Sequence, residues 1–194
     1  GCNLSIGPNN FFQELSINNS DTSGFSSAIE IASNCDVVVM ALGETAFMSG
    51  EGRSRSNLDL PGIQKQLLKK IYEVNPNVVL VLMNGRPLTI EWESDNIPSI
   101  LETWHCGTMA GEAIARILLG KENPSGKLTM TFPRNVGQIP IFYNKKSTGR
   151  PSSNPGQVFY SHHTDVSNLP LYPFGHGLSY TCLLYTSDAA DELL

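Results

Sequence analysis

The run DVVVMALG, Asp36–Gly43, decides the fold class of this sequence. It is a continuous β-branched and apolar run that ends in glycine, which is typical of a strand covered on both faces of a parallel sheet. A second run of this kind is NVVLVLM, Asn77–Met83, and the turn residues NGRP follow it. The segment IPSILETW predicts a third, weaker strand that ends at Trp104.

Segments with helical periodicity alternate with these strands. GFSSAIEIASNC predicts a short helix capped by Ser23 or Thr22, with Phe25, Ile29 and Ala32 on one side. Such alternation of helix and strand predicts an α/β fold, a three-layer α/β/α sandwich with a mainly parallel sheet.

Two further helices and one further strand complete the predicted domain. One helix has Pro61 in its first turn, and its apolar residues at helical spacing are Ile63, Leu67, Leu68, Ile71 and Val74. The other spans Gly107–Gly120, is closed by its last glycine, and has a predicted buried stripe of Met109, Ile114, Ile117 and Leu118. GKLTMTFP, Gly126–Pro133, alternates apolar and polar residues and predicts a strand near one edge of the sheet.

The chain divides into a lead-in, one domain and a tail. Residues 1–22 are polar and form the lead-in, and residues 23–181 form the domain. Within it, residues 135–170 are rich in Gly, Pro, Ser and Asn and predict a long surface loop region. PLYPFGHGLSYT then closes the domain as a strand or an extended segment. Residues 182–194 share no pattern with the rest and are interpreted as a non-native tail.

Composition limits the possible partners. The 194 residues are 40% hydrophobic and 16% charged, which suits a globular domain with a core. The net charge of −5 and the lack of a basic run argue against a nucleic-acid partner. No apolar run reaches the ~18–20 residues of a membrane helix. The cysteines, Cys2, Cys35, Cys106 and Cys182, lie far apart and predict free, partly buried thiols.

Phosphate and metal motifs are not supported. GKENPSGK, Gly120–Lys127, has five residues between its glycines where a phosphate loop has four, and Leu128 stands where Ser or Thr would bind magnesium. SGEGRSR lacks the third glycine of a dinucleotide fingerprint. His162 and His163 are adjacent, and no HxxxH or HxH spacing occurs, so no metal site is predicted.

The loop after the first strand, Gly43–Leu60, contains the candidate site. In open α/β sheets, ligands gather outside the carboxyl ends of the strands. Glu51 lies between two glycines of this loop, which allow the backbone to approach a ligand closely. From the pattern alone, Glu51 is either a solvated carboxylate or a catalytic group.

The arginines of this loop have three possible roles. Arg53 and Arg55 could be solvated, could pair with Glu44 or Asp59, or could hydrogen-bond a polyhydroxyl substrate. Pairing inside the loop would hold the loop in one shape.

A known family resembles this sequence in five blocks: GETAFMSGEGRSRSNLDLPG, VLVLMNGRP, ILETWHCGTMAGEAIARILLGKENPSGKLTMTFPRNVGQIPIFYN, STGRP and PLYPFGHGLSYT. Together they resemble the C-terminal α/β-sandwich domain of glycoside hydrolase family 3, and the bacterial periplasmic β-glucosidases in particular. The resemblance implies a sheet of five parallel strands and one antiparallel strand. It also implies a retaining glycosidase that acts on a β-linked oligosaccharide or glucoside in the periplasm or outside the cell, without a cofactor.

The resemblance also implies roles for residues. Glu51 matches the general acid/base, Glu44 matches a residue that shapes the loop, and Arg53 and Arg55 are expected to bind substrate or shape the loop. The nucleophilic aspartate belongs to an N-terminal (β/α)8 barrel that is absent here, so the chain alone is expected to be inactive. Cys106 stands where the family usually has proline, and this departure is expected to loosen that turn slightly.

Two other functions remain as alternatives. A noncatalytic module that binds carbohydrate or supports another domain needs no acid at position 51. A nucleotide-binding regulatory domain has only the sheet type in its favour.

Overall fold

The computed structural model describes residues 16–146, 149–151 and 158–181. The chain divides into two compact units, Gly1–His105 and Cys106–Leu194. Most of the predicted lead-in and the predicted tail at 182–194 lie outside the described residues. The limits of the predicted domain therefore stay predictions.

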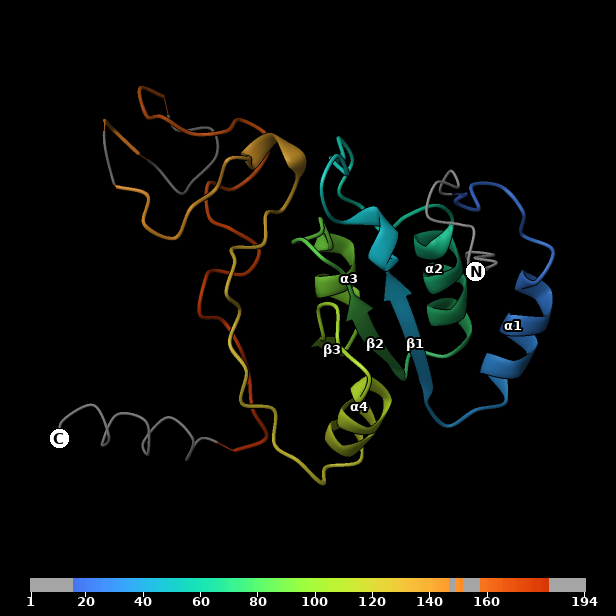
Figure 1. The fold of residues 1–194 in the computed structure, drawn as a ribbon. Helices are drawn as coiled ribbons and strands as arrows, with labels where there is room; N and C mark the ends of the chain where they lie inside the picture. The colour runs from blue at the N-terminus through green and yellow to red at the C-terminus, as the bar shows by residue number, and fades with distance from the viewer. Residues whose placement is uncertain (1–15, 147–148, 152–157, 182–194) are drawn as a thin grey trace, which may run out of the picture. The chain divides into compact units, whose positions relative to one another are not determined.

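A three-stranded parallel sheet forms the centre of the first unit (Figure 1). Its order is β1 (Val38–Gly43), β2 (Val78–Met83) and β3 (Ser99–Glu102). The α/β fold with a parallel sheet is thus confirmed. The other strands that the family resemblance implies are not found among the described residues.

The two apolar runs differ in burial. In β2 the buried residues are Val78, Leu80, Val81 and Leu82, each at most 2% exposed. In β1, Met40 is buried whereas its neighbour Val39 is 53% exposed. Successive side chains of a strand point to opposite faces, and β1 lies at the edge of the described sheet. The prediction of burial on both faces therefore holds for β2 and is wrong for β1.

Helix α1, Phe25–Ser33, begins without the predicted side-chain cap. Gly24 occupies the N-cap position, and the N–H of Phe25 donates to the backbone carbonyl of Thr22 at 2.9 Å. On the predicted apolar side, Ala32 is buried, and Phe25 and Ile29 are partly buried. The capping prediction was wrong because a backbone turn, and not a hydroxyl, closes this end.

Helix α2, Gln64–Val74, begins three residues later than the position of Pro61 had indicated. Its first residue is fixed by tertiary contact: the Gln64 amide accepts from the Gly43 N–H at 2.7 Å and donates to the Gly43 carbonyl at 2.9 Å. Leu68 and Ile71 are buried, while Val74 is 42% exposed. The placement of Pro61 in the first helical turn was therefore wrong.

The ends of α1 and α2 are joined by a buried amide. The side-chain N–H2 of Asn75 donates to the carbonyls of Ala32 at 2.9 Å and Cys35 at 2.7 Å. These bonds satisfy carbonyls at the end of α1, where a helix leaves its last acceptors without partners. Figure 1 shows α1 beside α2, and α2 beside β1.

Helix α3, Glu91–Asn96, was not predicted. Its sequence, EWESDN, is short and polar, so it gives no helical periodicity. The segment is held by its flanks, since Leu88, Ile90 and Ile97 are at most 5% exposed. Tertiary burial therefore determines this helix.

The second unit contains α4, Ala110–Leu118, and a 3-10 turn, η3, at Val136–Gln138. Gly120 follows α4 with φ +67°, as the predicted glycine closure requires. The predicted stripe of α4 is only partly buried: Ile114, Ile117 and Leu118 are half-buried, no α4 residue is fully buried, and Met109, which precedes the helix, is 62% exposed.

The strand predicted at Gly126–Pro133 is also wrong. This segment makes a single antiparallel bridge, Phe132 to Tyr172, and Leu128 donates its N–H to the His176 carbonyl and accepts from the Gly175 N–H. PLYPFGHGLSYT is accordingly an extended packing segment, one of its two predicted forms. In this unit the segment Gly126–Pro133 therefore pairs with the irregular segment at residues 170–181, and it does not form an edge strand of a sheet.

Candidate functional site at the carboxyl edge of the sheet

The parallel register brings the ends of β1 and β2 together. Gly43 lies opposite Met83, and Glu44 donates its N–H to the Met83 carbonyl at 2.7 Å. Gly43 has φ +136°, and a Cβ atom there would lie 1.8 Å from the Met83 oxygen, so only glycine fits. Glu44 and Asn84, the first residues after β1 and β2, therefore lie next to each other at the edge of the sheet.

Glu44 is the centre of a polar cluster at this edge. It is 5% exposed, and its Oε1 lies 2.7 Å from Arg55 Nη1 and 3.2 Å from Arg86 Nε. The Arg86 contact is an ion pair without hydrogen-bond geometry. Oε2 of Glu44 accepts from the Gly85 N–H at 3.2 Å and from the Ser49 hydroxyl at 3.4 Å. One buried carboxylate thus contacts both the loop after β1, through Ser49 and Arg55, and the turn after β2, through Gly85 and Arg86.

Arg86 fixes the first half of the loop. Its Nη2 donates to the Met48 carbonyl at 2.5 Å, to the Arg53 carbonyl at 2.8 Å and to Ser49 Oγ at 3.3 Å. Nη2 carries two N–H groups in the rigid guanidinium plane, so one of them is shared between two of these three acceptors. The backbone on both sides of Glu51 is therefore attached to the turn after β2.

Arg55 and Asp59 fix the second half of the loop. Arg55 donates from Nη2 to the Asp59 carbonyl at 2.9 Å, and the Asp59 carboxylate accepts from the Thr89 hydroxyl at 2.5 Å. Leu58 accepts from the Thr89 N–H at 2.9 Å. Both halves of the loop are thus fastened to the chain that follows β2.

Glu51 lies at the tip between these attachments. Its side chain is exposed, and among the described residues it has no hydrogen-bond or ion-pair partner. Gly50 and Gly52 have φ +127° and +68°, and the Arg53 N–H donates to the Gly50 carbonyl at 3.2 Å. The structure therefore gathers Glu44 and Arg55 into one cluster, and leaves the side chains of Glu51 and Arg53 exposed.

The sequence did not identify Arg86 or Glu102 as site residues. Arg86 was read only as part of the NGRP turn, and Glu102 only as the end of a weak strand. The only indication in the sequence was their position: Arg86 follows β2 and Glu102 ends β3, and the carboxyl ends of these strands share one edge of the sheet. That rule could have found them, although it could not have paired Arg86 with Glu44.

Glu102 is the most perturbed acid of this edge. Burial raises the pKa of its carboxyl to about 7, although hydrogen bonds from the Trp104 N–H and the Asn84 side chain act in the opposite direction. Its Oε1 accepts from the Trp104 N–H at 2.8 Å, whereas its buried Oε2 has no hydrogen-bond partner of good geometry among the described residues. A carboxyl whose pKa is raised by burial thus lies at the end of β3, at the same edge of the sheet as Glu44.

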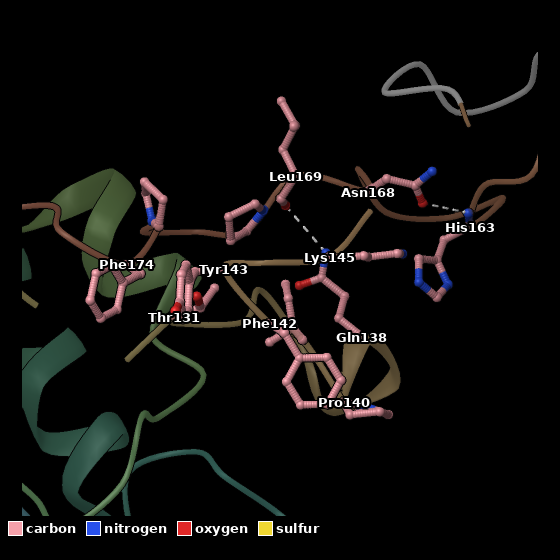
Figure 2. A pocket seen from close by; sticks show the side chains of 13 residues that line it. Thr131, Gln138, Pro140, Phe142, Tyr143, Lys145, His163, Asn168, Leu169 and Phe174 are labelled. Carbon is pink, nitrogen blue, oxygen red and sulfur yellow. Dashed lines mark hydrogen bonds between the residues drawn. The ribbon is translucent and has the colours of Figure 1, made fainter. Parts of the chain in front are cut away.

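A pocket of about 480 Å³ lies in the second unit (Figure 2). Tyr143 stacks on Phe174 at 4.5 Å between ring centroids, and the Gln138 amide donates to the carbonyls of Ser167 and Leu169. Among the described residues that line it, none is Asp or Glu and none is a predicted site residue. The described lining offers no carboxylate, whereas the sheet edge does, so the sheet edge is the candidate site.

Residues 16–146, 149–151 and 158–181 contain no group of three His, Cys, Asp or Glu residues placed to hold a metal ion. No helix of that part is long and apolar enough to cross a membrane. Cys35 is a free thiol as predicted, but Cys35 and Cys106 are both exposed, so the prediction of partial burial was wrong for them. Cys2 and Cys182 lie outside the described residues.

Comparison with known proteins finds one matching family and several similar glycosidases. The family model "Glycosyl hydrolase family 3 C-terminal domain" matches residues 6–180. A β-xylosidase of Formosa agariphila is 44% identical over 186 residues, which are 94% of this chain and 24% of the relative. A periplasmic β-glucosidase of Salmonella typhimurium is 48% identical over 156 residues, 79% of this chain and 20% of the relative.

A solved structure agrees with these relatives. The β-glucosidase of Listeria innocua in complex with gluconolactone superposes with a TM-score of 0.79 at 42% identity, covering 85% of this chain and 23% of that one. The chain thus spans about a quarter or less of the length of the proteins it matches.

Proposed function

Because the chain belongs to glycosyl hydrolase family 3 as its C-terminal domain, we propose that it is part of a retaining β-glucosidase-type enzyme. The substrate would be a terminal β-D-glucosyl or related residue of an oligosaccharide or glucoside. The names of the relatives support this class, since they are β-glucosidases and a β-xylosidase. The name of the Salmonella relative supports a periplasmic or extracellular location.

Within this proposal, Glu51 is the general acid/base. Retaining hydrolysis needs one carboxylate that attacks the anomeric carbon and a second group, about 5–5.5 Å away, that protonates the departing oxygen. The same group then removes a proton from the attacking water. The attacking aspartate would come from an N-terminal (β/α)8 barrel, and a loop closed against that barrel would exclude water and favour the protonated acid.

The observation that carries the proposal is the contrast between the base and the tip of the loop. Glu44, 5% exposed, fixes the base together with Arg55 and Arg86. The tip presents the exposed Glu51 between two glycines with positive φ. A carboxylate on a fixed base with a pliant tip can reach a reacting atom in another domain. Glu44 and Arg55 are therefore proposed to shape the loop, while Arg53 remains available to bind substrate.

The test is Glu51→Gln in the full-length parent polypeptide. We expect activity on glucosides with poor leaving groups to fall by about 10²–10⁴-fold, because a lost acid matters most there. Activated aryl glucosides should retain most of their rate of glycosylation. Glu73→Gln on the exposed face of α2 is the matched control and should leave both rates unchanged.

Two results would contradict the proposal. An equal loss on both substrate classes would remove Glu51 from acid catalysis. No loss on either would favour a noncatalytic carbohydrate-binding or structural module. The 194-residue chain by itself is expected to release no aryl group from a β-glucoside above the buffer rate, because the proposed nucleophile is not in it.

A further inference from the structure

We propose that Glu102 is a positioning residue for the loop that carries Glu51, and that it acts by holding the turn after β3 against Ser49. This inference rests on the proposed function of Glu51. All the residues involved belong to the first unit, Gly1–His105.

The turn after β3 has an unusual backbone. Trp104 has φ +52°, a left-handed conformation that is unfavourable for a bulky residue. Such conformations persist where the surroundings enforce them, and they cluster at functional sites. Here the Trp104 N–H donates to Glu102 Oε1 at 2.8 Å. The side chain of Glu102 thus supplies the acceptor that the turn requires.

The residue between them is fixed as well. Both the N–H and the hydroxyl of Thr103 donate to the Leu82 carbonyl at 2.9 Å. The chain therefore leaves β3 attached to β2, and the reversal at Trp104 determines where His105 lies.

His105 and Ser49 meet at Gly85. A Cβ atom on Gly85 would lie 2.1 Å from Ser49 Oγ and 3.0 Å from His105 Cδ2. The turns after β2 and β3 and the loop after β1 are therefore in close contact at this point. Ser49 directly precedes Gly50 and Glu51, so a shift of the turn is transmitted to the tip of the loop.

Because its surroundings are buried, the side chain at position 102 should accept from the Trp104 N–H without carrying a full negative charge. Oε2 of Glu102 and Oδ1 of Asn84 are both buried, and neither has a hydrogen-bond partner of good geometry among the described residues. A proton on Oε2 relieves the cost of a buried charge, while Oε1 still accepts from Trp104. Glutamine, which is uncharged and has the same acceptor, should therefore replace Glu102, whereas alanine should not.

The experiment compares Glu102→Ala and Glu102→Gln in the full-length parent polypeptide. With a poor leaving group, we expect Glu102→Ala to lower kcat by about 10- to 100-fold, the size of effect that small misplacements of catalytic groups produce. KM and the rate on activated aryl glucosides should change little. Glu102→Gln should restore most of the lost rate, and Glu73→Gln is the control for unchanged activity.

A second variant and a structural readout keep the test independent of folding and of Glu51. Gly85→Ala should displace Ser49 and give the same leaving-group pattern. Glu102→Ala should also speed trypsin cleavage after Arg53 in the chain, and Glu102→Gln should not.

The outcomes separate the two proposals. Equal losses from Glu102→Ala and Glu102→Gln, or no loss and no change in cleavage from either, would overturn the positioning role. If Glu51→Gln shows no leaving-group pattern while the cleavage difference persists, the function of Glu51 fails and the contact between the turn and the loop stands.

Discussion

Replacing Glu44 by alanine tests whether the polar cluster determines the loop. The Glu44 side chain is fully buried, and the side chains of Arg55 and Arg86 are 18% and 23% exposed. Removing one partner of a buried ion pair typically destabilises a protein by about 3–5 kcal/mol. Since both guanidinium groups keep some access to water, we expect a value near the lower limit, about 3 kcal/mol.

The chain offers a matched control for this change. Glu73 pairs with Lys70 at 2.8 Å, a distance close to the 2.7 Å between Glu44 and Arg55, but both side chains are about half exposed, at 58% and 48%. Exposed pairs contribute about 0–1 kcal/mol, so Glu73→Ala should change the free energy of unfolding by less than about 1 kcal/mol.

Urea unfolding of the 194-residue chain measures both values, and limited trypsin digestion reports on the loop. Glu44→Ala should release the backbone around Arg53 and Arg55 and speed cleavage there, whereas Glu73→Ala should not. If Glu44→Ala costs no more than Glu73→Ala and cleavage is unchanged, the carboxylate does not hold the loop.

Three further predictions follow from other features of the structure. The pKa of Glu102 is raised from 4.5 to about 7, so its ionisation is disfavoured in the folded state. The free energy of unfolding should fall as pH rises from about 4.5 to 7, by at most about 3 kcal/mol, and level off above that; urea unfolding of Glu102→Gln should lose this slope. Gly43→Ala should prevent the pairing of β1 with β2, because its Cβ would lie 1.8 Å from the Met83 oxygen, and circular dichroism would show the loss of native structure. Leu80→Ala, at a site with 0% exposure, should cost about 2–5 kcal/mol, while Val39→Ala at 53% exposure should cost much less; equal costs would contradict the one-sided burial of β1.

Local chemistry was enough to predict the main elements. Continuous β-branched runs predicted β1 and β2, because such runs have few stable alternatives to a buried strand. The ends of helices were predicted less well. Gln64 begins α2 because its amide meets Gly43, 21 residues earlier in the chain, and no local pattern contains that contact.

The errors have a common cause. The alternation in Gly126–Pro133 is compatible with a strand, but a strand needs several consecutive residues paired in register. In this segment only Phe132 forms a β-bridge, to Tyr172. The stripe on α4 has the spacing of a buried face, but burial depends on what packs against it. The periodicity of apolar residues is a property of a single segment, whereas sheet pairing and burial depend on a second segment that packs against it.

The same division applies to the candidate site. By itself the sequence determined the fold class, the family resemblance and the place of Glu51 in a glycine-rich loop after the first strand, because these depend on residue order. Only the tertiary structure decided that Glu44 pairs with Arg55 and Arg86, that Arg53 remains exposed, and that Glu102 supports the turn at Trp104. The physical reason is that the parallel register brings the carboxyl ends of three strands to one edge, where burial turns distant polar residues into partners.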